Sequence, residues 1–206
     1  MVKELFFYII SFLTIVNPLA GAAILVSLED DPHKIPHIAR RASSTLFIAS
    51  IITLLAGGAI LKLFGINIPS IKAIGGVILL TVALHMVQGR EVVPTRSTEE
   101  EHLEAAEKED IAIIPLTIPI LFGPGSITTL IVLSEKAQTF LEKWLLAGGV
   151  AITTLVTYLT LRNGIYISKF LGVNGIKIAT RLMGLVIGAI GFIFLVGGVK
   201  ALWLAS

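Results

Sequence analysis

Six apolar runs without Asp, Glu, Lys or Arg constrain this 206-residue chain more than any other feature of its sequence. A membrane-spanning helix needs about 20 predominantly apolar residues, which is close to the length of these runs. Hydrophobic residues make up 55% of the chain and charged residues 15%, whereas soluble domains carry about 25% charged residues. The sequence therefore predicts an all-α membrane protein with six transmembrane helices. The predicted spans are 5–28, 44–61, 73–88, 111–134, 144–161 and 182–199.

Charge and missing motifs exclude several classes of function. The net charge is only +2, and the charged residues lie mainly between the apolar runs, so no basic face for a nucleic acid is visible. The absence of cysteine excludes disulfides, thiolate metal sites and cysteine nucleophiles. No GxSxG, HExxH or Walker-type motif occurs. We expect neither an enzyme nor a cofactor or metal site, and a lipid bilayer is the partner that the composition predicts.

An acidic stretch divides the chain. Eight of the 14 acidic residues lie within 89–110, which we interpret as a solvated linker between a first unit, 1–88, and a second unit, 111–206. A regulatory role for this linker is the less favoured alternative. Lys and Arg are more frequent in cytoplasmic loops. Ten of them fall on the side of the first, third and fifth loops and six on the other side, which predicts that both termini lie outside.

The two units resemble each other in sequence order. Each contains three predicted spans, an odd number, so the second unit must enter the membrane from the opposite side, and the repeat is predicted to be inverted. Matched helix breaks in inverted repeats are the best sequence indication of a secondary transporter's binding site. A duplication retained for the fold alone is the alternative. The matches are Val16-Asn17-Pro18 with Phe122-Gly123-Pro124 at an offset of 106, Phe64-Gly65-Ile66-Asn67 with Leu171-Gly172-Val173-Asn174 at 107, and Gly76 with Gly184 and Gly89 with Gly197 at 108.

Two of these matches predict broken helices. Proline cannot donate a backbone hydrogen bond, and Asn and Gly are favoured before the first turn of a helix, so Asn17-Pro18 and Gly123-Pro124 read as N-cap followed by N1. Twelve residues separate Leu5 from Asn17, roughly 18 Å of helix, which places the break near the middle of a hydrocarbon core about 30 Å thick. We therefore expect the first and fourth spans to stop and restart near the membrane midplane.

The predicted binding site surrounds these breaks. Restarted helices direct N–H groups at an anion, while the helices that end there direct carbonyls at a cation or ammonium group. Facing breaks could thus hold both ends of a zwitterion. Hydroxyls near the breaks could instead bond back to their own helices, as they often do. His85, the one ionisable residue in the predicted spans, is expected to have a structural role. The candidate residues are Thr14, Asn17, Pro18, Leu19, Ala20, Gly21, Thr117, Gly123, Pro124, Gly125 and Ser126, with Thr128 and Thr129 as further hydroxyls nearby.

Several strings resemble the MarC family, which includes the SnatA small neutral amino acid transporters. They are Asn17-Pro18-Leu19, IGGVILL at 74–80, IPLTIPILFGPGS at 114–126 and RLMG at 181–184, and the resemblance extends over nearly the whole chain except the acidic linker. The resemblance implies a six-span protein of the inner (plasma) membrane and, in the SnatA branch, ion-driven transport of glycine, alanine and similar amino acids. Ala20 stands where many relatives carry glycine.

These observations lead to one functional hypothesis with two alternatives. We expect a secondary transporter of small neutral amino acids, coupled to a gradient of H⁺ or Na⁺, with the substrate held between the broken first and fourth spans. A passive channel for small neutral solutes would also place paired helix N-termini at the midplane. An exporter of drugs or metabolites would need a larger apolar cavity. Glycine-rich helix faces make a homo-oligomer plausible.

Overall fold

Helices account for nearly all of the chain that the computed structural model describes, residues 2–29, 31–89 and 111–205, and no strand occurs in that part. Most of the predicted linker, 90–110, lies outside the described residues. In chain order the helices are α1 (Val2–Val16), α2 (Pro18–Leu28), α3 (Ile35–Leu63), α4 (Ile68–Gln88), η1 (Ala112–Leu121), α6 (Pro124–Lys136), α7 (Phe140–Arg162) and α8 (Gly164–Ala205).

Five stretches of helix within the described residues are long and apolar enough to cross a membrane, counting α1 and α2 together as Val2–Leu28. The pair η1 and α6, bent by 59°, would make a sixth. The prediction of an all-α membrane protein is confirmed. Most of the long helices extend beyond the predicted spans: α3 begins at Ile35, nine residues before the predicted span at 44, and the last spanning stretch is Asn174–Leu204. Charge-free runs underestimate such helices because Lys and Arg at helix ends can extend their charged groups toward water.

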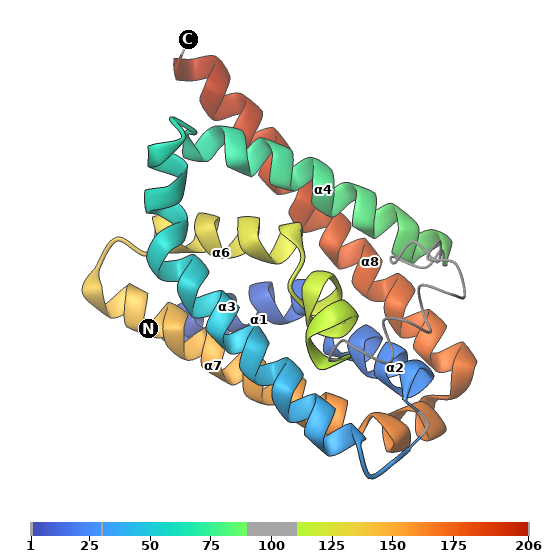
Figure 1. Cartoon of the computed structure of the whole chain (residues 1–206). Helices are drawn as coiled ribbons and strands as arrows, with labels where there is room; N and C mark the ends of the chain where they lie inside the picture. Colours follow the sequence, from blue (N-terminus) through green and yellow to red (C-terminus); the bar gives the residue numbers. More distant parts are fainter. Residues whose placement is uncertain (1, 30, 90–110, 206) are drawn as a thin grey trace.

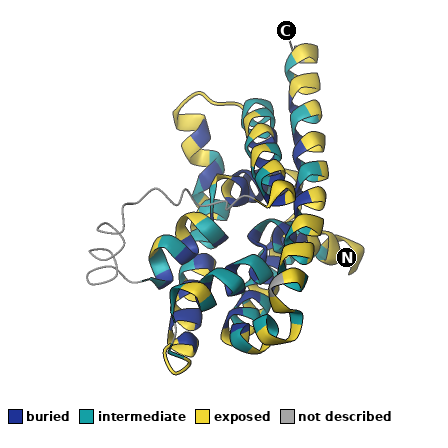
Figure 2. Cartoon of the chain, turned by 90° about the vertical axis from the view of Figure 1, so that its right-hand side faces the viewer, coloured by how far each residue is buried: buried dark blue, intermediate teal, exposed yellow. Residues whose placement is uncertain are grey.

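The short helices lie between two pairs of long ones. In Figure 1, α1, α2, η1 and α6 occupy the middle of the molecule, with α3 and α7 on one side and α4 and α8 on the other. The main core cluster joins these central helices to α3 and α7 through fully buried side chains such as Phe12, Leu46 and Leu116. Figure 2 shows the exposed residues mainly along the outer sides of the long helices. Many of these are large and apolar, as expected of surfaces that face lipid.

Glycines bring α4 and α8 into close antiparallel contact. Glycine has no Cβ, and the position that one would occupy shows how closely the neighbouring helix approaches. At Gly76 this position lies 2.6 Å from the carbonyl oxygen of Gly191, and at Gly184 it lies 3.2 Å from the carbonyl oxygen of Ala83. Adding 108 to 76 and 83 gives 184 and 191, so the second contact repeats the first with the helices exchanged. Small residues allow such close approach of membrane helices. This part of the helix pair therefore has contacts related by an approximate two-fold exchange.

Candidate functional site

The first interruption lies between α1 and α2, at Asn17. Pro18 has no N–H to continue the hydrogen bonding of α1, and the residue before a proline is disfavoured in the right-handed helical region. Asn17 adopts a left-handed conformation, with φ 48° and ψ 66°, which Asn tolerates better than most residues. Its side-chain oxygen accepts a long hydrogen bond of 3.5 Å from the N–H of Ala20, and its carbonyl accepts one of 3.2 Å from that of Gly21. Asn17 therefore caps α2.

The second interruption lies between η1 and α6. Within η1, hydrogen bonds of the π-helical type run from Leu116 N to Ile111 O and from Phe122 N to Thr117 O, and the peptide bonds before Pro115 and Pro119 are cis. Pro124 begins α6, where Gly123 is the N-cap residue and provides no side-chain acceptor. The first N–H groups of an α-helix have no partner within the helix. Unlike α2, α6 therefore begins without a side-chain cap.

The two interruptions are packed against each other. A Cβ on Gly125, just after the second interruption, would lie 3.8 Å from Cγ2 of Ile15, just before the first. A Cβ on Gly21, just after the first, would lie 2.6 Å from Cδ2 of Leu121, just before the second. The end of each preceding helix thus touches the start of the opposite restarted helix (Figure 1). Glycine at both places leaves room for this crossing.

The hydroxyl groups of the predicted site mostly have backbone partners. Thr14 donates to the carbonyl of Ile10 at 2.7 Å, and Ser126 donates to that of Leu121 at 3.2 Å. The fully buried Thr117 hydroxyl lies 2.6 Å from the carbonyl of Ala112 and 3.1 Å from that of Ala42 on α3. The Thr14 hydroxyl therefore bonds back to its own helix, which is the alternative that the sequence left open for these hydroxyls. Thr117 additionally connects η1 to α3.

The remaining candidates differ in their exposure. Asn17, Pro18, Gly21, Gly125 and Ser126 are buried, whereas Leu19, Ala20 and Gly123 are partly buried and Pro124 is exposed. The predicted residues of the two segments are thus brought together by the contacts of Gly21 and Gly125, but Pro124 faces outward.

Three further residues belong to the surroundings of the interruptions. Cδ2 of Leu79, on α4, would lie 2.7 Å from a Cβ on Gly125, and Leu121 fills the equivalent place beside Gly21. Thr129 is fully buried, and its hydroxyl has no hydrogen-bond partner among the described residues. It lies four residues after Gly125 and therefore on the same helix face. The sequence already indicated Thr129 as a hydroxyl near the second interruption, whereas only the fold brings Leu79 here.

The electrostatics of the site come from the backbone. The last carbonyls of a helix and the first N–H groups of the next carry opposite partial charges. Ile15 lies in the last turn of α1 and touches the first turn of α6 at Gly125, so the negative end of one helix adjoins the positive end of another. No group of three or more His, Cys, Asp or Glu suited to a metal ion occurs among the described residues. The arrangement is suited to a ligand that carries both charges.

Comparison with known proteins identifies relatives along almost the full length. Residues 2–203 match the family described as MarC family integral membrane protein. A UPF0056 membrane protein of Aquifex aeolicus is 33% identical over 94% of this chain and 91% of its own length. One of Methanocaldococcus jannaschii is 33% identical over 96% of this chain and 98% of its own, and YhcE of Escherichia coli is 28% identical over 96% and 93%. No solved structure matches. This chain belongs to the MarC family of integral membrane proteins.

Proposed function

We propose that this protein is a secondary transporter of small neutral amino acids such as glycine and alanine. The observation that carries the proposal is the contact between the end of α1 and the uncapped start of α6. The substrate carboxylate accepts hydrogen bonds from the N–H groups of Gly125 and Ser126, which no capping side chain occupies. Its ammonium group donates to the last carbonyls of α1, where Pro18 offers no N–H to the carbonyl of Thr14.

The proposal favours the second interruption over the first for the carboxylate. At α2, the N–H of Ala20 already donates to the side chain of Asn17, so a carboxylate there would have to replace that bond. At α6, no side chain has to be displaced. Asn17 then contributes by fixing the turn that ends α1, and the unpartnered hydroxyl of Thr129 is a further donor to the substrate or ligand to a coupling ion.

Substrate size follows from the packing beside the glycines. Leu79 and Leu121 fill the space next to Gly125 and Gly21, so only a ligand with a small side chain fits after a modest movement of these leucines. Glycine and alanine satisfy that requirement, whereas a drug-sized molecule would need a much larger cavity. The packing therefore favours amino acid transport over drug or metabolite export.

The proposed transport cycle uses the predicted inverted repeat to open the site to each side of the membrane in turn. The exchanged contacts of Gly76 and Gly184 support a two-fold relation between units 1–88 and 111–206. In inverted-repeat transporters, one unit moves against the other around a fixed central site, which is open to each side in turn. We place that site between the interruptions, near the membrane midplane, in a plasma-membrane protein with both termini outside.

Coupling to H⁺ or Na⁺ is part of the same proposal. Carbonyl and hydroxyl oxygens at the interruptions, including that of Thr129, are suitable ligands for Na⁺. Proton coupling would require a titratable group outside this immediate cluster. The choice between the two ions is therefore an experimental outcome.

The direct test is uptake of radiolabelled glycine into proteoliposomes under an imposed proton or sodium gradient. We expect accumulation above equilibrium, abolished by the ionophore that collapses the coupling gradient. Equilibration without accumulation would instead indicate the passive channel. Absence of any glycine flux from correctly inserted protein would refute amino acid transport and favour export of another solute.

The site is tested by binding of glycine to purified variants. Gly125→Val adds a side chain where even a Cβ would contact Leu79 at 2.7 Å, and Asn17→Leu removes the residue that shapes the first interruption. We expect both variants to lose glycine binding. Gly148→Val is the matched control, because nothing lies within 4 Å of a Cβ at that position. Gel filtration checks folding, and unchanged binding by monodisperse Gly125→Val and Asn17→Leu would refute this site.

A further inference from the structure

A groove of about 580 Å³ lies between α3 and α7, away from the two interruptions. Most of its lining is apolar and includes Phe47 and Ile48 from α3 and Ala151 and Leu155 from α7. Ile48 is 58% exposed and Leu155 is 56% exposed, so the protein itself leaves this surface uncovered. Both helices are long and apolar enough to cross a membrane. The uncovered groove therefore faces lipid chains.

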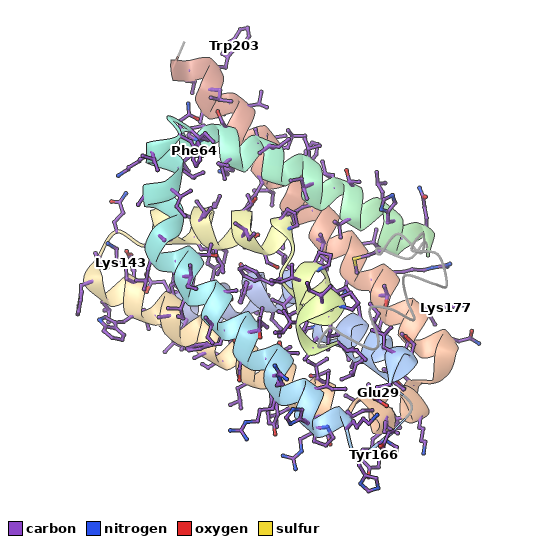
Figure 3. The ribbon with its side chains drawn as sticks, in the orientation of Figure 1. Glu29, Phe64, Lys143, Tyr166, Lys177 and Trp203 are labelled. Atoms are coloured by element: carbon purple, nitrogen blue, oxygen red, sulfur yellow. The ribbon has the colours of Figure 1, made fainter. Side chains whose placement is uncertain are left out.

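One end of the groove is basic. Arg40 and Tyr158 line it, and no carboxylate among the described residues forms an ion pair with Arg40. Arg162 lies against Tyr158: its Nη1 is 3.2 Å from the phenol oxygen, and its guanidinium carbon is 6.0 Å from the ring centre. The start of α3 and the end of α7 lie at the same end of the molecule, near the labelled Glu29 and Tyr166 (Figures 1 and 3). Arg40 thus lines one end of the apolar groove, and Arg162 lies beside that end through its contact with Tyr158.

Unsatisfied polar atoms lie in the same groove. Ser43 is only 4% exposed, yet its hydroxyl has no hydrogen-bond partner among the described residues. The buried hydroxyl of Thr154, opposite it on α7, also lacks one. A buried hydroxyl without a partner is costly, and because both oxygens are closed off from the groove surface, a ligand oxygen accepts their protons only once the side chains rotate toward the groove. A second hollow, of about 320 Å³, shares Arg40 and adds His37 and Arg41 beside it.

We propose that this groove is a binding site for one anionic phospholipid. Arg40 and Arg162 bind the phosphate, Ser43 donates to a phosphate or glycerol oxygen, and an acyl chain lies along Phe47, Ile48 and Leu155. Charge and apolar lining together identify this class of ligand, because basic residues between membrane helices attract anionic headgroups. The acidic segment 89–110 of the chain itself offers carboxylates, but its sequence has few long apolar side chains to fill the groove. The phospholipid accounts for both parts of the site.

Native mass spectrometry of the full chain in detergent tests the proposal, with phosphatidylglycerol and phosphatidylcholine of identical acyl chains as the probes. We expect tighter binding of phosphatidylglycerol. Because one basic residue contributes about fivefold to such binding, Arg40→Gln should weaken phosphatidylglycerol binding about fivefold. Arg181→Gln, on α8 and outside the groove, is the matched control and should bind as the wild type does. Ala151→Phe fills the apolar part and should weaken binding of both lipids.

Three results would overturn the proposal. The first is equal binding of the two lipids by the wild type, and the second is equal loss of phosphatidylglycerol binding in Arg40→Gln and Arg181→Gln. The third is a preference for phosphatidylglycerol that emerges only after Glu99, Glu100 and Glu101 are changed to Gln. That result would mean that the acidic segment of the wild type occupies the groove in place of a lipid. Inorganic phosphate at the same concentration should not compete with phosphatidylglycerol. Competition would overturn the proposal as well, because it would show that the site binds a free anion without needing an acyl chain.

Discussion

Replacing Gly76 by alanine tests the close contact of α4 and α8 with the smallest possible change. The new Cβ would lie 2.6 Å from the carbonyl oxygen of Gly191 and would also meet the backbone of Leu195. Both are main-chain atoms in a helix, so no side-chain rotation relieves the clash. The helices must separate locally by several tenths of an ångström, and neighbouring contacts such as that of Gly198 with Ala73 would separate as well.

The expected cost follows from two opposing effects. Overpacking of this kind costs about 1–3 kcal/mol, whereas exchanging glycine for alanine inside a helix gains about 1 kcal/mol. We therefore expect Gly76→Ala to lower the free energy of unfolding by up to about 2 kcal/mol. Gly184→Ala should cost less, because its nearest obstacles, Cβ of Met86 at 2.9 Å and Cγ2 of Val87 at 3.1 Å, lie farther from the new Cβ. Gly148→Ala keeps the gain of about 1 kcal/mol without a clash, because its surroundings are open.

Thermal stability of the detergent-solubilised protein measures this order, as the fraction that remains monodisperse in gel filtration after heating. At about 2–4 °C per kcal/mol for a chain of this size, Gly148→Ala and Gly76→Ala should differ in Tm by roughly 2–12 °C, with Gly184→Ala between them. Equal Tm values for Gly76→Ala and Gly148→Ala would refute the assignment of this contact as a close helix crossing.

Substitutions at three other positions test local features by the same heating assay. Asn17→Gly should change the free energy of unfolding by less than about 0.5 kcal/mol, because glycine adopts φ 48° freely. Asn17→Ala should lower it by about 2 kcal/mol, because alanine lacks the capping oxygen and disfavours the left-handed backbone. Equal losses in the two variants would contradict this account of Asn17. Thr139→Ala removes the hydroxyl that accepts from the N–H of Glu142, while the backbone N–H of residue 139 can still donate to the Glu142 carboxylate, and the change should cost about 1 kcal/mol. Gly172→Ala, at φ 60° and ψ 176°, should cost about 1–3 kcal/mol, and no loss would mean that α8 is straight there.

Much of the fold could be predicted from the sequence because membrane spans and proline-induced breaks depend on local chemistry. Apolar length identified the spans, and Asn17 and Gly123 do precede the first residues of α2 and α6. Lys and Arg in 162–181 led us to expect a loop there, but the structure is helical from Gly164 and kinked at Gly172. Charge indicates where water is expected, whereas backbone hydrogen bonding decides whether a helix continues.

The course of η1 could not be predicted in detail, because Pro115 and Pro119 disfavour an uninterrupted α-helix but do not specify the backbone that replaces it. Its shape depends on the Thr117 hydroxyl, which lies within hydrogen-bonding distance of Ala42 on α3, and on the bend before Pro124. The contact of Ile15 with Gly125 likewise joins residues 110 positions apart. Such contacts exist only after the helices pack, so the sequence could nominate both interruptions but not their pairing.

The two interruptions look equivalent in the sequence, yet their caps differ, and under the proposed function this difference sets the direction in which the substrate binds. Asn17 has a side-chain oxygen that reaches back to α2, while Gly123 at the matching position has none, and a Cβ there would lie 2.7 Å from the carbonyl of Pro119. The tight turn therefore excludes a capping side chain before α6 and leaves its first N–H groups to a ligand. If the carboxylate binds there, Asn17→Gly should leave glycine affinity nearly unchanged, whereas a carboxylate held at α2 would bind more tightly once Asn17 no longer competes for the N–H of Ala20. The matched sequence motifs thus form two different interruptions, one capped by its own side chain and one without a side-chain cap, and the proposed site is asymmetric for that reason.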